Sequence, residues 1–236
     1  RVLAIEPDNA DALNNKGNAL SNLGNDQEAI TYYDRVLAIE PNDVTALGNR
    51  GVSLSNLNKT QEAIEAYDKA LVIEPANVNA LFNKAFALSN LNRTQEAIDY
   101  YDKVLAIEPN NADALNNIGV ALSNLQRYRE AIEYYDRALS VNPNDVMVLY
   151  NKGLVFHNLG RYQDAIEYYD RSLAINPNSV QALNNKANAI ASLAESIGPV
   201  GYYGRPFLTQ SGYVFVTAQG NTRNMSTNAS NNYLEI

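Results

Sequence analysis

The stretch RVLAIEP at residues 1–7 recurs letter for letter at residues 35–41 and, as KVLAIEP, at residues 103–109. Its proline belongs to a series spaced 34 residues apart: Pro7, Pro41, Pro75, Pro109, Pro143 and Pro177. A fixed period of this length is typical of arrays in which one small supersecondary unit is stacked repeatedly. We therefore expect residue 1 to lie inside a unit and not at its natural edge.

Each unit has the pattern of a helical hairpin. In the first complete unit, the sequence predicts a helix from about Ala10 to Leu23 and a second helix that ends near Pro41. An Asn, Asp or Ser stands before each first helix, where its side chain can cap the free N–H groups: Asn9, Asp43, Asn77, Asn111, Asp145 and Ser179. Gly or Asn marks the turn between the two helices: Gly24, Asn58, Asn92 and Gly160.

Apolar and small residues recur at helical spacing inside the unit, as in Leu13, Gly17, Leu20, Ala29, Tyr33 and Val36. This pattern and length resemble the tetratricopeptide repeat. The resemblance implies an all-α fold, a right-handed α-solenoid of stacked antiparallel helix pairs. The chain departs from the family at Leu13, where Trp is common, and at Ala85 and Ala187, which replace the glycine of Gly17.

The expected organisation has three parts. Residues 1–9 form the second helix of a truncated preceding repeat, residues 10–193 hold five complete repeats and a first helix that acts as C-terminal cap, and residues 194–236 form a non-repeat tail, extended or disordered. Within this tail, residues 207–219 are strand-like and residues 221–232 are polar and of low complexity.

The origin of the tail stays open between three interpretations. It is part of a truncated further domain, a disordered or artificial end, or an arm that lies on a repeat array. In the last case Phe207, Tyr213 and Phe215 would fill apolar pockets.

Composition excludes several classes of function. The formal charge of -8 and the absence of a basic cluster argue against nucleic acid as a partner. No apolar run reaches the roughly 20 residues that a membrane span needs, so no membrane is expected as a partner. The chain has no Cys, which is compatible with a reducing or an oxidising compartment. The localisation is therefore unknown, with the cytoplasm slightly favoured.

Catalysis is not expected. A reaction site would need unlike residues that break the repeat, and no catalytic, metal or cofactor site is visible. The one histidine, His157, stands where other units have Ser21, Ser55, Ser89 and Ser123. Acidic columns such as Asp34, Asp68, Asp102, Asp136 and Asp170 indicate a solvated helix surface. Acid–base pairs four residues apart, such as Glu65 with Lys69, support the second helices.

One amide recurs in the middle of every first helix: Asn15, Asn49, Asn83, Asn117, Asn151 and Asn185. Asn is a mediocre helix former, so something other than propensity places it there. Packed helices lie about 8–10 Å apart, and an extended peptide rises about 3.3 Å per residue. One amide would thus meet every third peptide residue and offer both donors and an acceptor to its main chain. We call these six residues the Asn ladder. Alternatively, the same amides brace neighbouring helices.

The columns beside the Asn ladder are apolar in their middle. Candidate contacts for ligand side chains are Val52, Phe82, Phe86, Val120, Tyr150 and Leu154, with His157 further along the groove. An equally open alternative is that these residues extend the packing between repeats. Lys and Arg are absent from the positions at which related superhelices clamp a terminal carboxylate. The basic column Lys16, Arg50, Lys84, Lys152 and Lys186 is adjacent to the ladder but points about 100° away.

The sequence therefore favours a non-enzymatic scaffold that binds a protein or peptide in extended conformation on its concave face. One alternative is a regulatory array cut from a larger protein with a catalytic or sensor domain. Another is a self-assembling module that associates through its tail or its end repeats.

Overall fold

The computed structural model describes residues 2–197, 207–209, 212–216 and 222–225. These residues fall into two compact units, unit 1 up to Val141 and unit 2 from Asn142 onward. Unit 1 contains α1 (Val2–Ile5), α2 (Ala10–Asn22), α3 (Asp26–Ile39), α4 (Val44–Asn56), α5 (Thr60–Ile73), α6 (Val78–Asn90), α7 (Thr94–Ile107), α8 (Ala112–Asn124) and α9 (Tyr128–Val141). Unit 2 contains α10 (Val146–Asn158), α11 (Tyr162–Ile175), α12 (Val180–Ile197), β1 (Phe207–Thr209), β2 (Gly212–Val216) and β3 (Thr222–Met225).

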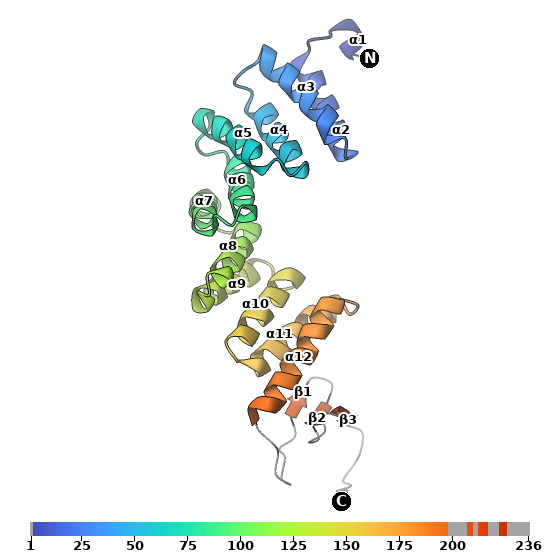
Figure 1. Ribbon diagram of the computed structural model, residues 1–236, viewed down its shortest axis with the longest axis vertical. Coiled ribbons are helices and arrows are strands. Elements are labelled where there is room, and N and C mark those ends of the chain that lie inside the picture. The colour runs from blue at the N-terminus through green and yellow to red at the C-terminus, as the bar shows by residue number, and fades with distance from the viewer. Residues whose placement is uncertain (1, 198–206, 210–211, 217–221, 226–236) are drawn as a thin grey trace, which may run out of the picture. The chain divides into compact units, whose positions relative to one another are not determined.

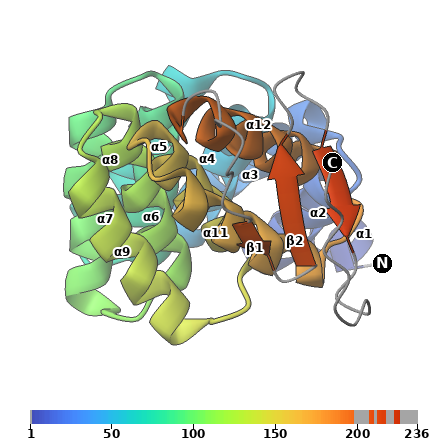
Figure 2. The same ribbon diagram turned by 90° about the horizontal axis from the view of Figure 1, so that it is seen from below.

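The helices form the predicted hairpins. Consecutive helices pack as pairs: α2 with α3, α4 with α5, α6 with α7 and α8 with α9 in unit 1, and α10 with α11 in unit 2. Within each unit the second helices also pack against the next first helix: α3 against α4, α5 against α6 and α7 against α8 in unit 1, and α11 against α12 in unit 2. Within unit 1 the first helices α2, α4 and α6 lie on one side and the second helices α3, α5 and α7 on the other (Figure 1). Seen from below, α6, α7, α8 and α9 lie side by side (Figure 2).

The predicted caps are confirmed. The side chains of Asn9, Asp43, Asn77 and Asn111 each accept a hydrogen bond from the backbone N–H three residues later, over 2.9 Å. Asp145 and Ser179 act in the same way at α10 and α12. These contacts satisfy N–H groups that a first helical turn leaves free.

The turn between the two helices of each complete repeat contains one residue in the left-handed conformation. The predicted residues Gly24, Asn58, Asn92 and Gly160 all have φ between 58° and 77°. The left-handed turn of the fourth repeat was not predicted, because its residue is neither Gly nor Asn: Gln126 adopts φ 58° there. Its N–H donates to the Ser123 carbonyl and the Arg127 N–H to the Leu122 carbonyl, both over 2.9 Å, so the helix end is closed as in the glycine turns.

A tyrosine from each second helix forms the centre of each repeat. These five rings are at most 1% exposed: Tyr33, Tyr67, Tyr101, Tyr135 and Tyr169. Gly17 explains the close approach, since a Cβ there would lie 2.5 Å from Cε1 of Tyr33. Repeat 3 has Ala85 in place of this glycine, and Tyr101 is nevertheless fully buried. The repeat interior is therefore built around the small-residue and tyrosine contact that the sequence pattern indicates.

The C-terminal region differs from expectation in two places. Helix α12 continues to Ile197, beyond the predicted limit at residue 193. Ala194 and Glu195 are good helix formers, and the first helix breakers stand at Gly198 and Pro199. Strand β3 lies inside the segment read as polar and low in complexity.

The described residues of the tail include a three-stranded antiparallel sheet in the order β1-β2-β3. Phe207 pairs with Val214, and Tyr213 pairs with Met225. Strands β1 and β2 fall within the predicted strand-like stretch. The expected insertion of tail aromatic side chains into pockets concerns atoms outside the described part of the chain.

Candidate functional site

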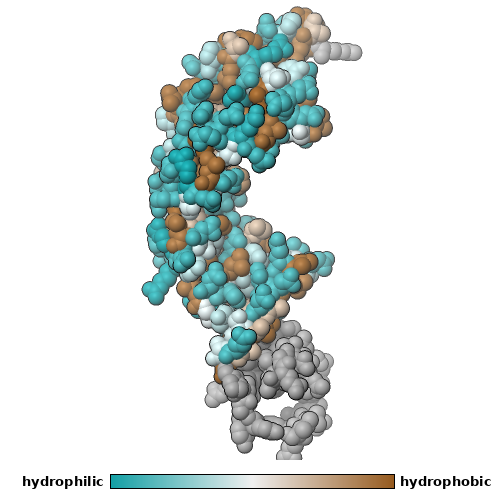
Figure 3. Space-filling view, viewed as in Figure 1, coloured by the Kyte–Doolittle hydropathy of each residue, from teal (hydrophilic) through white to brown (hydrophobic). Residues whose placement is uncertain are grey.

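The first helices α2, α4 and α6 of unit 1 contact one another in succession, and α8 follows through α7, against which both α6 and α8 pack. The space-filling view shows hydrophilic and hydrophobic residues interspersed on the visible face of unit 1 (Figure 3). We call this surface of α2, α4, α6 and α8 the first-helix surface. It carries four of the six residues of the Asn ladder.

The four ladder residues of unit 1 remain accessible. Asn15 is exposed, and Asn49, Asn83 and Asn117 are partly exposed. None of these four residues is fully buried between helices, so each keeps part of its surface accessible to solvent.

One ladder residue also braces two repeats. The Nδ2 group of Asn49 donates to Oδ1 of Asn18 over 2.9 Å. The same oxygen accepts from the hydroxyl of Tyr33 over 2.8 Å. The ladder residue Asn117 lies near another buried tyrosine: burial raises the pKa of Tyr101, and interactions with Asn117 and Ser89 offset part of that rise. Bracing is therefore present at Asn49, as the alternative interpretation anticipated.

In unit 2 the Asn185 amide donates to the hydroxyl of Tyr150 over 2.7 Å. The Tyr150 ring lies 5.9 Å from that of Tyr169, centre to centre. Leu154 and the ladder residue Asn151 are partly exposed. Tyr150 therefore combines a packing contact with a hydrogen bond between repeats.

The histidine packs against an aromatic ring. The ring of His157 meets that of Tyr162 edge to face at 5.3 Å, and its Nε2 atom is buried without a hydrogen-bond partner. The residue as a whole is partly exposed. A role of His157 in ligand binding remains a prediction.

The apolar candidates of unit 1 differ in accessibility. Phe86 is 50% exposed and Val52 is 36% exposed, on helices α6 and α4 of the first-helix surface. Phe82 is partly buried because its ring packs edge-on against Tyr101, with centroids 5.3 Å apart. Val120 is partly exposed. Phe82 thus extends the core, whereas Phe86 and Val52 leave apolar area free.

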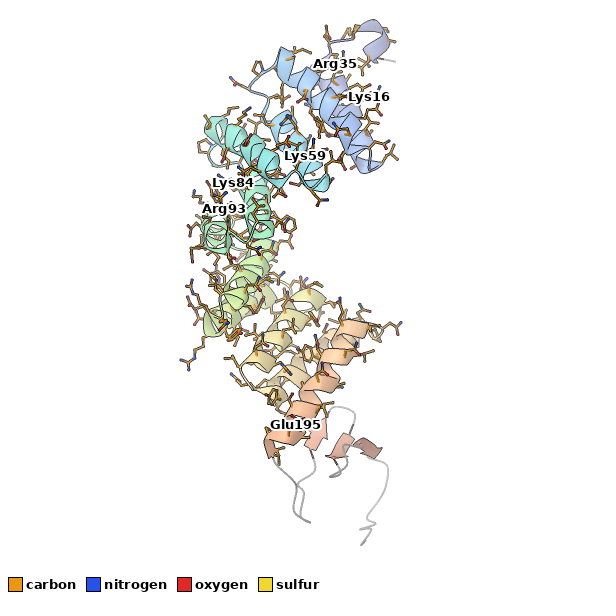
Figure 4. The ribbon with its side chains drawn as sticks, viewed as in Figure 1. Lys16, Arg35, Lys59, Lys84, Arg93 and Glu195 are labelled. Atoms are coloured by element: carbon orange, nitrogen blue, oxygen red, sulfur yellow. The ribbon has the colours of Figure 1, made fainter. Side chains whose placement is uncertain are left out.

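The basic column turns toward the second helices. Arg50 Nε donates to Asp34 Oδ1 over 2.7 Å. Lys84 is 8% exposed and contacts Asp68 of the preceding repeat and the hydroxyl of Tyr100. Figure 4 shows Lys84 where α5 and α6 meet. The acidic columns are therefore more than a solvated face, because they hold neighbouring repeats together.

Burial acts to lower the pKa of Lys84, but the hydrogen bonds to Asp68 and Tyr100 outweigh it, so that this pKa is raised overall. The ammonium group stays charged. A similar cross-repeat pair joins Lys186 and Asp170 in unit 2.

Repeat 4 lacks the cation that this arrangement requires. Ile118 occupies the place of Lys84 and is fully buried. Partial burial and the neighbouring Asp99 raise the pKa of Asp102, and Tyr134 and Arg137 offset part of that rise. The sequence already indicated this missing cation, because Ile118 interrupts the basic column between Lys84 and Lys152.

The predicted pairs four residues apart are not formed. No ion pair joins Glu65 to Lys69, nor the corresponding residues of the next three second helices, within residues 2–197 that the structure describes. Instead Lys103 lies over the ring of Tyr100, 4.1 Å from its centroid. Arg137 and Arg171 lie over the rings of Tyr134 and Tyr168 in the same way, three residues earlier, whereas Ala66 stands at this place before Lys69.

A polar cluster between repeats 1 and 2 was not anticipated. Asp26 is 6% exposed and accepts from Ser21 over 2.7 Å and from Asn56 over 3.2 Å. Burial acts to raise the pKa of Asp26, but the hydrogen bonds of Ser21, Ser53 and Asn56 lower it overall. The only sequence signal was an acid where the next repeats have Thr60 and Thr94.

Two further structural features bear on function. Among the described residues, no three His, Asp or Glu side chains gather as a metal site would require. Over the same part of the chain, every helix is too short or too polar to cross a bilayer.

Three family models described as tetratricopeptide repeat match the chain, at residues 10–43 and 44–77, at 77–144 and at 116–180. No curated protein matches the sequence.

Several solved structures share the fold. YrrB, described as a TPR protein with an unusual peptide-binding site, is 22% identical with a TM-score of 0.65, over 78% of this chain and 95% of its own. MamA from Desulfovibrio magneticus RS-1 is 22% identical with a TM-score of 0.67, over 72% and 97%. A tetratricopeptide repeat protein from Parabacteroides merdae is 22% identical with a TM-score of 0.71, over 80% and 75%. At these identities the similarity shows the fold alone.

Proposed function

Because this chain belongs to the tetratricopeptide repeat family, whose members are generally non-catalytic scaffolds for protein interaction, we propose that it binds an extended peptide segment along its first helices. The Asn ladder would contact the peptide main chain. The apolar side chains beside it would contact peptide side chains. The description of YrrB as having a peptide-binding site supports this proposal at the level of the fold.

The observation that carries the proposal is the accessibility of the ladder amides. Asn15 is exposed, and Asn83 and Asn117 are partly exposed, on helices that follow one another along one surface. A carboxamide has two donors and an acceptor, which complement the C=O and N–H of an extended chain. Neighbouring helices about 8–10 Å apart match a contact at every third peptide residue.

The exposed Phe86 and Val52 would add affinity. Removal of apolar area from water contributes about 25 cal/mol per Å². The main-chain contacts would have no sequence preference, so the scaffold would accept many peptides. The apolar subsite would favour peptides that have an apolar residue at the position that meets Phe86 and Val52. Phe82, held against Tyr101, would form a fixed wall of that subsite.

The test uses a phage-displayed library of random dodecapeptides selected on the whole chain. The double variant Asn83→Ala, Asn117→Ala removes two ladder amides and leaves the brace at Asn49 intact. Each lost hydrogen-bonding amide should cost about 1 kcal/mol, so the loss of two should weaken the binding of selected peptides about thirtyfold.

The matched control is Asn42→Ala, Asn110→Ala, which removes two exposed amides from the loops between repeats. Its affinity for the same peptides should equal that of the wild type. Equal binding by the ladder variant and the wild type, measured by isothermal titration calorimetry, would rule out the Asn ladder as the peptide contact.

Self-association is a second candidate because α12 exposes an apolar side that other repeats bury. Leu183 is 47% exposed, whereas the equivalent Leu149 is 1% exposed. The natural complement of this side is another helix of the same repeat, which a second copy supplies. Light scattering over a concentration series should show dimers that a Leu183→Asn variant loses; a monomer at every concentration would exclude this role.

A further inference from the structure

The first helices of unit 1 contain three cations, and all three occupy the same repeat position: Lys16, Arg50 and Lys84. Each reaches a residue of a second helix. Lys16 donates to the Tyr32 hydroxyl and lies 4.3 Å from the centre of that ring. Arg50 and Lys84 pair with Asp34 and Asp68 of the preceding repeats.

These contacts hold the cations on the side of the second helices. Lys84 has only 10% of its side chain exposed, and Arg50 has 27%. Moving either group to the first-helix surface would separate it from its carboxylate and leave that carboxylate uncompensated. Arg50 and Lys84 are therefore held by carboxylates and away from a groove ligand. Lys16 is exposed and contacts the uncharged hydroxyl of Tyr32, which also lies on a second helix.

The remaining charges on these helices are acidic. Asp11 and Asp113, both exposed, are the acidic side chains within α2, α4, α6 and α8. The whole chain carries a formal charge of -8. An acidic peptide side chain that lost its water here without a cationic partner would cost binding free energy. The negative field of the chain, by contrast, attracts cationic peptides and speeds their association.

The apolar area on this surface has a defined place. Val52 on α4 and Phe86 on α6 occupy the same position of successive repeats, and α4 and α6 are in contact. Asn49 and Asn83 each lie three residues earlier on the same two helices. A peptide held by these two amides would therefore place about one side chain between Val52 and Phe86.

We propose that the first-helix surface of unit 1 selects an internal segment of a neutral or basic partner, with one aliphatic or aromatic side chain seated between Val52 and Phe86. The proposal rests on the proposed function. It deepens that function by naming the chemistry of the partner. Acidic segments and segments ending in a free carboxylate are disfavoured, because Arg50 and Lys84 are already paired with carboxylates and Lys16 is directed to Tyr32 of a second helix.

The probes are fluorescein-labelled dodecapeptides with amidated C-termini in three classes whose flanks carry Lys, Gln or Glu, and the Gln class is also made with a free terminal carboxylate. Each class has a version with Leu and a version with Ser at the centre. Binding to the whole chain is followed by fluorescence anisotropy at 50 and 300 mM NaCl, since salt screens charge attraction. The Lys class should bind at least tenfold more tightly than the Glu class at low salt, and the difference should shrink at high salt.

The apolar subsite is tested with Phe86→Asn, a residue that the chain itself uses at this position in Asn18 and Asn188. The Leu peptide should bind at least fivefold more tightly than the Ser peptide to the wild type and with equal affinity to the variant. The matched control is Val72→Asn, because Val72 is 82% exposed on a second helix. It should retain the preference for Leu.

The outcomes separate this inference from the proposed function. If Glu peptides or peptides with a free terminal carboxylate bind as tightly as Lys peptides and still require Asn83 and Asn117, the charge selection is wrong and the proposed function stands. If the Leu preference survives in Phe86→Asn, the subsite assignment is wrong. If no class binds, or binding ignores Asn83 and Asn117, the proposed function itself fails.

Discussion

The Nε atom of Arg50 lies 2.7 Å from Oδ1 of Asp34, so a first helix is joined by charge to the second helix of the preceding repeat. The pair is one member of a column that includes Lys84 with Asp68. Ion pairs of this kind use residues that a helical surface would otherwise expose. They also remove the cations from the surface that is proposed to bind peptide.

The first prediction concerns the repeat that lacks this pair. Asp102 has a raised pKa, so the folded state binds its proton more tightly than the unfolded state. The resulting stability is present below the reference value of 3.8 and is lost as pH rises through the higher folded pKa. Asp102→Asn should therefore be more stable than the wild type at pH 7, with no advantage near pH 3.

Urea unfolding at both pH values checks this expectation. Asp68→Asn is the matched control, because its partner Lys84 is mostly buried. The control should be less stable than the wild type at pH 7. A loss of stability in Asp102→Asn at pH 7 would contradict the interpretation of this site.

The second prediction concerns the buried carboxylate of Asp26, whose pKa is lowered. Stability from its hydrogen bonds is present above the reference value of 3.8 and is lost as pH falls through the lower folded pKa. Asp26→Asn should cost about 1–2 kcal/mol at pH 7, and the difference should narrow in acid. Asp8→Asn should change stability little, because the side chain of Asp8 is 80% exposed in its ion pair with Arg35.

The third prediction uses the left-handed turn at Gln126. A residue other than Gly or Asn loses about 1 kcal/mol or more in this conformation. Gln126→Gly should raise the free energy of unfolding by about 1 kcal/mol, measured in guanidinium chloride. Gly24→Gln should lower it by a similar amount, since Gly24 has φ 77°. Equal stability of both variants and the wild type would show that the turn is not a source of strain.

The fourth prediction concerns the contact between Gly51 and Tyr67. A Cβ at Gly51 would lie 2.4 Å from Cε1 of the ring, so the ring must move. Gly51→Ala should change stability by less than about 1 kcal/mol, because helix propensity offsets the ring shift. Gly51→Val should cost about 3 kcal/mol through overpacking. Thermal unfolding of both variants tests the distinction; a neutral valine variant would contradict it.

The fifth prediction separates bracing from binding within the Asn ladder. Asn49→Ala breaks the hydrogen bond to Asn18 and should cost about 1 kcal/mol of stability. Asn83→Ala, which breaks no hydrogen bond to another side chain in unit 1, should leave stability within about 0.5 kcal/mol. Both should weaken peptide binding. Equal losses of stability in the two variants would show that the whole ladder is structural.

The features of the fold that depend on local chemistry could be predicted from the sequence, and those that depend on contacts between repeats could not. The caps at Asn9 and Asp43 and the turn at Asn58 follow from local chemistry, and the structure confirms them. Gln126 was missed because the turn is imposed by the packing of two helices and not by the preference of its own residue. The polar cluster at Asp26 was missed because its partners come from another repeat.

The sequence by itself determined the repeating unit: its period of 34 residues, its two helices, its caps and its tyrosine centre. These features depend on local propensity and on periodicity, which a linear chain records directly. Only the tertiary structure decided which side chains of neighbouring repeats meet, as Lys84 meets Asp68 and Asn49 meets Asn18. Such contacts depend on the distance and angle between helices, and the sequence period carries neither.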